Sequence, residues 1–211
     1  PIYEGKVGEN MDNRLHFYAL NQREVPSVTG DTIPDYTSSF AEYETKTIGK
    51  YSEDLIAAGA SDLIVGKEWV NSRGIIFRFD RRAVEIRVMD EQECIKADVS
   101  LSCFVRALTR GLMTKMELLP HHVLVKDFKA ITKQGLNAKT LHPEGKTARQ
   151  VCQHFLKIAS ENATLEEKKY LPFISKRIEQ GSLSQIIRKR VEAKTRKTEF
   201  IEAIVGVYSS L

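Results

Sequence analysis

The segment from Gly74 to Asp90 constrains the fold most, because apolar and polar residues alternate there over two consecutive runs. Apolar side chains take every second position, at Ile75, Phe77, Phe79, Val84, Ile86 and Val88. A period of two is typical of strands that bury one face. The link between the runs is short and polar, so the pattern predicts a β-hairpin.

The register of this hairpin can be predicted from the parity of its loop. An even loop pairs Phe79 with Val84 and Phe77 with Ile86, and on the other face it pairs Arg78 with Glu85 and Ile76 with Arg87. An odd loop would mix apolar and polar residues on each face, which a half-buried sheet resists. We therefore expect a buried apolar face and a polar face that carries Arg78, Asp80, Glu85 and Arg87. The loop lacks the Asn-Gly or Asp-Gly of a tight turn, so its length stays open.

Two interpretations of the polar face remain open from spacing alone. It can be a solvated sheet face with an Arg78–Glu85 pair between the strands. It can also be a site in which Glu85 binds a hard cation and Arg87 binds a phosphate or carboxylate.

The rest of the chain reads as helices and loops, which makes the fold class α+β. Apolar periodicity and capping residues predict helices over residues 11–23, 39–59, 97–118, 123–134, 147–160, 165–177, 183–194 and 197–209. Residues 1–8 and 25–36 read as loops. Thr147 and Thr164 are good caps, and Thr164 and Glu167 have the spacing of a capping box. Arg14 and Tyr18 lie one turn apart and share a helix face, either as a site or as an arginine lying over a tyrosine.

Charge and cysteine content exclude some functional classes. The net charge is +4, from 32 basic and 28 acidic residues, and this balance argues against a dedicated nucleic-acid binder. The basic run over residues 176–197 is a solvated helix face or, alternatively, a contact for an anionic partner. Three cysteines without metal-ligand spacing indicate a reducing, cytoplasmic compartment. We expect no membrane span, because no apolar run reaches about 18 residues, and we find no signal peptide.

Several segments in order resemble the glutamate–cysteine ligase family and the related carboxylate–amine ligases. Glu85-x-Arg87-x-x-Asp90 followed by a long helix resembles one block of that family. The opening PIYEGK resembles a loop of the family, and SSFAEYE at 38–44 resembles the start of one of its helices. Arg14 and Tyr18 then stand for an arginine and an aromatic residue, and Arg73 for an arginine before the strand. The resemblance covers residues 1 to about 115 and weakens in the helical tail.

The resemblance implies a fold and a reaction. The fold would be part of an antiparallel β funnel, as in the glutamine synthetase and glutamate–cysteine ligase catalytic fold, with a mostly helical C-terminal region. Residues 1–118 would form the C-terminal part of the catalytic domain, and residues 119–211 a helical region packed on it. Enzymes of this type use ATP to phosphorylate a carboxylate, and an amine such as cysteine then attacks the acyl phosphate to form an amide.

The same resemblance assigns roles to particular residues. Glu85 would be a ligand of Mg²⁺, and Arg87 would be catalytic, contacting the transferring phosphoryl group or the substrate carboxylate. Arg14, Tyr18 and Arg73 would bind the glutamate-like substrate. Arg78 is a lesser candidate.

One departure from the family pattern concerns the metal. The family holds its other magnesium ligands on an upstream Glu-x-Glu strand. No Glu-x-Glu is expected on a strand of this sequence, because Glu91-Gln92-Glu93 follows the hairpin, and one carboxylate does not hold two ions. Together with a first residue that is Pro1, this predicts a C-terminal half, a processed product or a separate subunit. Such a chain would be inactive without a missing N-terminal segment or a partner chain, and a homo-oligomer is possible.

Two other functions stay open. The first is a non-catalytic binding or interaction domain that keeps the ligase fold. The second is a basic helical module that binds nucleic acid through residues 176–197.

Overall fold

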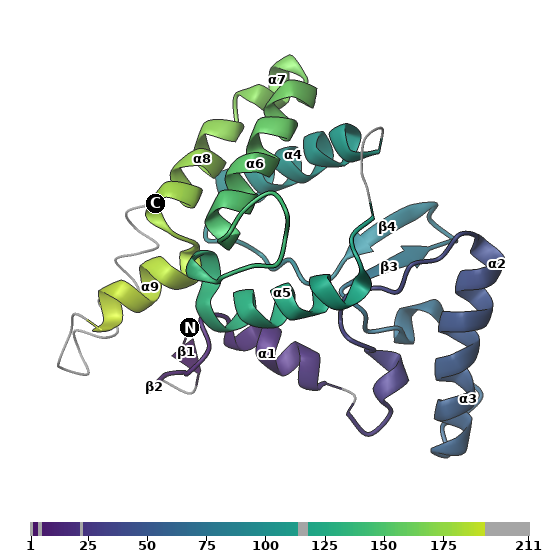
Figure 1. Ribbon diagram of the computed structural model, residues 1–211. Helices are drawn as coiled ribbons and strands as arrows, with labels where there is room; N and C mark the ends of the chain where they lie inside the picture. Colours follow the sequence, from purple (N-terminus) through teal and green to yellow (C-terminus); the bar gives the residue numbers. More distant parts are fainter. Residues whose placement is uncertain (1, 4–5, 22, 114–117, 193–211) are drawn as a thin grey trace. The chain divides into compact units, whose positions relative to one another are not determined.

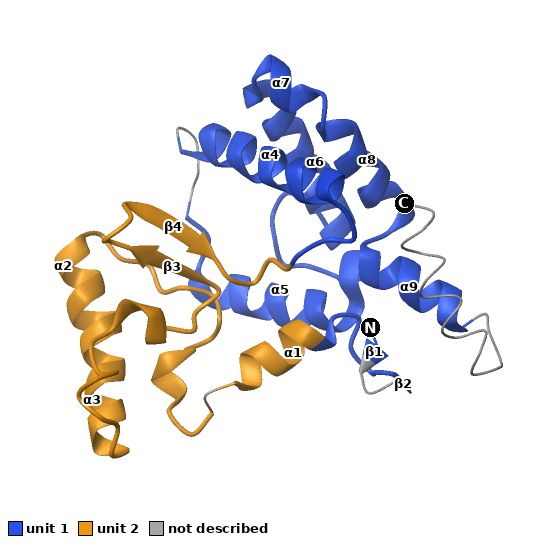
Figure 2. Ribbon diagram, turned by 180° about the vertical axis from the view of Figure 1, so that it is seen from behind, with its two compact units in different colours: residues 1–13, 91–211 blue, residues 14–90 orange. Residues whose placement is uncertain are grey.

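The computed structural model describes the chain apart from residues 1, 4–5, 22, 114–117 and 193–211 (Figure 1). The contacts of the chain divide it into two compact units (Figure 2). Unit 1 consists of residues 1–13 and 91–211, and unit 2 of residues 14–90. In this division, the long helix after Asp90 belongs to the same unit as the later helices. The predicted domain boundary at residue 118 stays a prediction.

The α+β prediction is confirmed. Helices dominate both units, and the strands of the described residues form two antiparallel pairs, β1 with β2 and β3 with β4. A larger funnel-shaped sheet stays a prediction.

Unit 2 is built from a continuous helical segment, the hairpin and irregular connections. The helical segment comprises α2 (Phe40–Tyr43), the π-helix η2 (Glu44–Gly49) and α3 (Lys50–Ala57). It begins as predicted, because Ser39 accepts a hydrogen bond from the backbone N–H of Glu42. The remaining elements are α1 (Asn13–Leu20), which enters unit 2 at Arg14, the 3₁₀ turns η1 (Pro26–Val28) and η3 (Glu68–Val70), β3 (Ile75–Arg78) and β4 (Ala83–Ile86).

The hairpin and its even loop are confirmed, but the predicted register is wrong by two residues. The structure pairs Phe77 with Val84 and Arg78 with Ala83, so the loop is 79–82. The ladder stops early because the N–H of Phe79 donates to the carboxylate of Glu68 (2.9 Å) instead of to the facing strand. The Phe79 ring packs on Phe40 of α2, with ring centroids 3.8 Å apart.

The predicted assignment of buried and exposed faces is also wrong. Phe77 and Val84 on the apolar face are 40% and 55% exposed. Ile76 is only 1% exposed, and by alternation it shares the face of Arg78 and Glu85. The polar face is therefore the more enclosed side of this hairpin in the described part of the chain.

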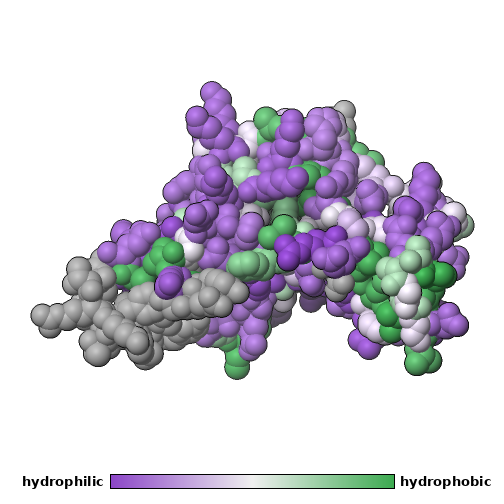
Figure 3. All heavy atoms as spheres, turned by 90° about the horizontal axis from the view of Figure 1, so that it is seen from below, coloured by the Kyte–Doolittle hydropathy of each residue, from purple (hydrophilic) through white to green (hydrophobic). Residues whose placement is uncertain are grey.

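A second apolar surface of unit 2 lies around helix α3. In Figure 3, hydrophobic residues gather over the α3 end of unit 2, whereas hydrophilic residues cover much of the rest of that view. Ile56 of α3 and Leu63 of the following turn are both exposed.

Unit 1 is a set of helices with a short pair of strands. Its helices are α4 (Ile95–Leu112), α5 (His121–Gln134), α6 (Ala148–Asn162), α7 (Leu165–Lys168), α8 (Leu171–Gln180) and α9 (Leu183–Glu192), with a 3₁₀ turn η4 (Gly135–Asn137). Helices α4, α6 and α8 pack against one another (Figure 1). Small buried residues, Ala107 of α4 and Ala159 of α6, are fully enclosed, which allows close helix approach.

Two predictions for unit 1 need correction. A single helix over residues 165–177 is wrong, because Pro172 lies in the first turn of a separate helix α8 and its ring cannot occupy a helix interior. Residues 1–8 are not all loop: β1 (Ile2–Tyr3) pairs with β2 (Lys6–Val7). Ile2 packs on the buried pair Ile187 and Val191 of α9, which supports this short pairing.

The capping predictions hold. Thr147 and Thr164 each form a complete capping box, with Gln150 and Glu167 respectively. The predicted helix over 197–209 lies outside the described residues. Within the part of the chain that is described, no helix is long and apolar enough to span a membrane.

Candidate functional site

Glu85 lies on β4 between two arginine side chains. Arg78 Nη1 donates to Glu85 Oε2 at 2.9 Å, and Arg87 Nε donates to Glu85 Oε1 at 2.9 Å. The hydrogen bond from Arg78 lowers the pKa of Glu85 below its ordinary value, and Arg87 adds to this effect. The carboxylate of Glu85 is therefore ionised at neutral pH. Through its two hydrogen bonds it links the side chains of Arg78 and Arg87.

The guanidinium of Arg87 is oriented by the backbone before the hairpin. Its Nη1 donates to the carbonyl oxygen of Asn71, and its two Nη atoms contact the carbonyl oxygen of Trp69 at 3.3 and 3.4 Å. These last two contacts are near the limit of a hydrogen bond. The Nη2 edge therefore keeps much of its capacity to bind an anion.

Arg14 and Tyr18 of α1 share a helix face, as their spacing predicts, and both contact residues that flank the hairpin strands. Tyr18 Oη donates to the carbonyl oxygen of Arg73 at 3.2 Å. Burial raises the pKa of Tyr18, while the charges of Arg87 and Arg14 oppose the shift and that of Glu85 reinforces it. Tyr18 thus lies within electrostatic reach of all three charges and stays a neutral donor near pH 7.

The guanidinium of Arg14 contacts the residues that follow β4. It donates to the carbonyl oxygen of Val88, and its Nε lies 2.8 Å from Asp90 Oδ2. Gly74 permits this compact strand end, because a Cβ there would lie 2.7 Å from Val88 Cγ1 and 2.9 Å from the Thr32 carbonyl oxygen.

Arg73 is buried, and its side chain contacts the loop 25–36. Its Nη1 donates to the carbonyl oxygen of Ser27 at 2.9 Å, and its Nη2 lies 3.3 Å from Asp35 Oδ2. It touches the site through its backbone, which accepts the hydrogen bond from Tyr18. A positioning role fits this geometry, and substrate binding by Arg73 stays a prediction.

The structure therefore brings five of the six predicted residues into one region of unit 2. We call Glu85, Arg87, Arg78, Tyr18 and Arg14 the Glu85 cluster, with Arg73 behind it.

Three further residues support this cluster and were not predicted. Asn71 is fully buried, donates to Tyr43 Oη at 2.7 Å and accepts from the N–H of Arg73 at 3.0 Å. Glu68 lies 3.5 Å from Arg78 Nε. Asp90, the last residue of the Glu-x-Arg-x-x-Asp pattern, pairs with Arg14. Only Asp90 carried a sequence signal, because Asn71 and Glu68 lie in an irregular connection without periodicity.

The described residues do not form a metal site by themselves. Among them, no group of three or more histidine, cysteine or acidic side chains is arranged to hold a metal ion. Mg²⁺ requires about six oxygen ligands in octahedral geometry. Each carboxylate oxygen of Glu85 has a second lone pair beside the one engaged by arginine, so Glu85 can supply one ligand.

A comparison with protein families decides the relationship of this chain. The family model of glutamate-cysteine ligase family 2 (GCS2) matches residues 1–205. The chain belongs to this family. The Glu-x-Arg-x-x-Asp pattern and its flanking segments are therefore GCS2 segments, as the resemblance implied.

Two relatives add detail to the GCS2 assignment. An "Uncharacterized protein" of Archaeoglobus fulgidus is 43% identical over 187 residues, covering 89% of this chain and 47% of that protein. A "Putative glutamate--cysteine ligase 2" of Trichormus variabilis is 28% identical over 137 residues, covering 59% of this chain and 35% of that protein. The chain thus spans about half the length of these relatives or less. No solved structure matches it.

Proposed function

We propose that this chain is the C-terminal part of an ATP-dependent carboxylate–amine ligase of the glutamate–cysteine ligase type. One observation carries the proposal: in a GCS2 chain, Glu85 is held between Arg78 and Arg87, and Tyr18 lies within electrostatic reach of Glu85, Arg87 and Arg14. The guanidinium groups beside this half-buried carboxylate carry N–H donors with the geometry that binds phosphate and carboxylate groups.

The proposed reaction has two steps. A carboxylate oxygen of a glutamate-like substrate attacks the γ-phosphorus of ATP, the bond to the β-phosphate oxygen breaks, and ADP leaves. The amine nitrogen of the second substrate, such as cysteine, then attacks the acyl carbon and loses a proton, and inorganic phosphate leaves. Phosphoryl transfer of this kind depends on positioning and charge stabilisation.

Each residue of the Glu85 cluster has a task in this proposal. The Nη2 edge of Arg87, whose present contact is 3.4 Å long, donates to the oxygens of the transferring phosphoryl group. Arg14 and Tyr18 bind the glutamate-like substrate, through charge and through a neutral hydroxyl. Arg78 holds Glu85 ionised, and Arg73 holds the loop 25–36 that backs the site.

Glu85 is proposed as one ligand of Mg²⁺, the ion that would neutralise the phosphates of ATP. Its oxygens have the right chemistry for a hard cation. We propose that the other ligands come from residues outside this sequence, in an N-terminal segment or a partner chain. The enclosed polar face of the hairpin, together with an exposed apolar face, supports a larger sheet in the whole protein. We place the protein in the cytoplasm, where Cys94, Cys103 and Cys152 can stay free thiols.

The test is ADP formation from ATP with glutamate and a panel of amines including cysteine. It is assayed on the 211-residue chain and on a version extended upstream with the sequence of its gene. We expect turnover in the extended version only. In that version, Arg87→Met should lower kcat/KM by about 10²–10³-fold, as for the loss of one transition-state donor.

Arg81→Met is the matched control, because Arg81 is an exposed arginine of the same hairpin whose side chain lies 3.7 Å from Asp80. It should keep normal kcat/KM. Turnover by the 211-residue chain alone would contradict its incompleteness. Normal activity in an extended Glu85→Gln variant would contradict the metal role.

A second function is favoured by one specific observation. The side chains of Arg73, Arg78 and Arg87 all contact partners within this chain. A non-catalytic binding domain that keeps the family fold would have this property. If the extended version neither forms ADP nor binds ATP, this second function replaces the first.

A further inference from the structure

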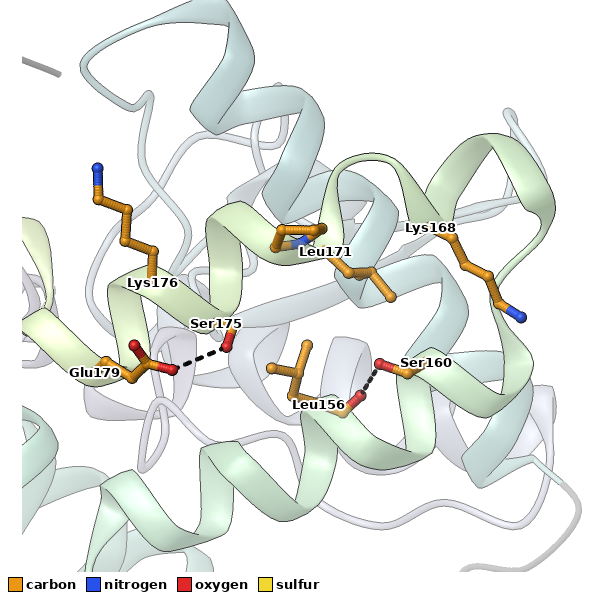
Figure 4. Close-up of a pocket in the computed structure, with 8 residues that line it drawn as sticks. Leu156, Ser160, Lys168, Leu171, Ser175, Lys176 and Glu179 are labelled. Atoms are coloured by element: carbon orange, nitrogen blue, oxygen red, sulfur yellow. Dashed lines mark hydrogen bonds between the residues drawn. The ribbon is translucent and has the colours of Figure 1, made fainter.

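A groove of about 670 Å³ runs over α6, α7 and α8 of unit 1 (Figure 4). Ser160 donates to the Leu156 carbonyl oxygen at 2.7 Å, and Ser175 donates to Glu179 at 3.3 Å. Both serine hydroxyl groups of this lining are therefore engaged within the chain, as the dashed lines in Figure 4 show. The contacts that bear on the proposed reaction lie in unit 2, in the connection between η3 and β3.

Asn71 begins this connection, and it is fully buried. Its Oδ1 accepts the backbone N–H of Arg73 at 3.0 Å, which closes an Asx turn over residues 71–73. Its Nδ2 donates to Tyr43 Oη of α2 at 2.7 Å. Asparagine is mostly an exposed residue, and its burial here is compensated by these two hydrogen bonds. The side chain of Asn71 therefore fixes the course of the chain at this point.

The peptide group between Asn71 and Ser72 is held from two sides. Its N–H donates to the Val28 carbonyl oxygen of η1 at 2.8 Å. Its carbonyl oxygen, which belongs to Asn71, accepts from Arg87 Nη1. The turn made by the Asn71 side chain thus determines where Arg87 finds its acceptor.

Arg87 has a second fixed point on the hairpin. Its Nε donates to Glu85 Oε1 at 2.9 Å. A guanidinium is planar and rigid, so hydrogen bonds from two of its nitrogen atoms set the orientation of its plane. The contact of Nη2 with the Trp69 carbonyl oxygen is longer, at 3.4 Å. Asn71 and Glu85 together therefore aim the Nη2 edge.

We propose that Asn71 is a positioning residue of the ligase reaction, an inference that rests on the proposed function. Its Asx turn holds its own carbonyl oxygen in place, and this oxygen holds Arg87 Nη1. The Nη2 edge of Arg87 is then directed at the oxygens of the transferring phosphoryl group. Asn71 acts through Arg87 and does not touch the substrates itself.

The first measurement is ADP formation by the version extended upstream. Asn71→Ala removes both side-chain hydrogen bonds of Asn71 and should lower kcat about tenfold, because a displaced donor costs transition-state stabilisation. The KM for ATP should stay within about threefold. Asn71→Asp keeps an oxygen for the Arg73 N–H, and its charge lies near the Arg73 guanidinium, so kcat should stay within about threefold.

Tyr43→Phe is the matched control, because it also removes a hydrogen bond of Asn71 but leaves the Asx turn in place. It should lower the midpoint of thermal unfolding and keep kcat within about twofold of the unmodified protein. Asn71→Ser, which retains a weaker turn, replaces Asn71→Ala if that variant does not fold. A loss of kcat in Tyr43→Phe equal to that in Asn71→Ala would overturn the proposal.

A double-mutant cycle separates positioning from general damage to the fold. In an Arg87→Met background, Asn71→Ala should lower kcat by less than about a further twofold, because no guanidinium is left to position. Equal factors in both backgrounds would overturn the proposal, since Asn71 would then act independently of Arg87.

The second measurement uses the 211-residue chain and needs no turnover. The Nε–H resonance of Arg87 is followed by ¹⁵N NMR and assigned by its loss in Arg87→Met. It should shift in Asn71→Ala and much less in Tyr43→Phe, while the resonance of the exposed Arg81 stays in place in both. An unmoved Arg87 resonance in folded Asn71→Ala would overturn the role of Asn71 alone. An extended version that forms no ADP would overturn the proposed reaction and this role together.

Discussion

The two units bury charged side chains in different surroundings. In unit 2, Arg73 is enclosed by polar acceptors, since its side chain contacts Ser27, Asn71 and Asp35. In unit 1, the buried ion pair of Arg177 and Glu93 lies beside an apolar cavity. A charge with several acceptors keeps some of them when one is removed, whereas a charge with one partner in apolar surroundings loses its main compensation.

This comparison predicts how each unit responds to substitution. An apolar environment makes an unpaired charge expensive, and a polar network spreads the loss. Four substitutions test the difference, beginning with the one for which we expect the largest effect.

The largest effect is expected for Glu93→Ala. It leaves the Arg177 guanidinium buried without its ionic partner, so the free energy of unfolding should fall by about 3–5 kcal/mol. Urea unfolding followed by circular dichroism measures the change. The double variant Glu93→Leu with Arg177→Met replaces both charges by apolar groups and should recover most of the loss. A double variant as unstable as Glu93→Ala would show that packing, and not the unpaired charge, is responsible.

A smaller loss is expected for Arg73→Met in unit 2. Several acceptors lose their donor, but Asp35 is largely exposed and can be solvated. We expect a decrease of about 2–3 kcal/mol in the free energy of unfolding. Arg81→Met, on an exposed side chain, should change it by less than about 0.5 kcal/mol. If Arg73→Met were as mild as Arg81→Met, the polar network would not stabilise unit 2.

Local capping should matter less than either buried charge. Thr164→Ala removes the hydroxyl that accepts from the Glu167 N–H at the start of α7, which should cost about 1 kcal/mol. Thr109→Ala is the control, because Thr109 lies within α4, far from the helix N-terminus, and its hydroxyl donates to the Val105 carbonyl oxygen. The two midpoints of thermal unfolding are compared, and equal midpoints would argue against the capping role.

The smallest effect is the pH dependence from Glu85. Its pKa in the folded chain lies below the ordinary value of 4.5, chiefly because Arg78 donates to it. The contribution of this carboxylate to stability is therefore fully present above pH 4.5 and is lost as the pH falls through the lower folded-state pKa. The stability difference between the unmodified chain and Glu85→Gln should shrink as the pH is lowered to about 3. A difference that is constant with pH would exclude the charged contact as its source.

The helices of unit 1 follow from local sequence. Thr147 and Thr164 carry their own capping partners three residues on, so the starts of α6 and α7 are predicted correctly. The separation of α7 from α8 could also be read from Pro172, since the effect of proline on a helix is local. The pairing of β1 with β2 could not, because it depends on contacts with α9 far along the chain.

The hairpin shows the limit of pattern analysis. Alternation and parity are properties of neighbouring residues, so the two strands and the even loop were predictable. The register depends on Glu68 and Phe40, which engage Phe79 from other parts of unit 2. The identity of the enclosed face likewise depends on what covers Ile76, which no periodicity specifies.

By itself, the sequence determined the α+β class, the helix caps, and a family pattern that singled out Glu85, Arg87, Arg14, Tyr18 and Arg73. The tertiary structure decided what these residues touch. It joined Glu85 to Arg78 and Arg87, turned the Arg73 guanidinium toward Ser27 and Asp35, and made Asn71 a buried support. The physical reason is range: capping and alternation act within a few residues, whereas burial and hydrogen-bond partners are set by segments that meet only in the folded chain.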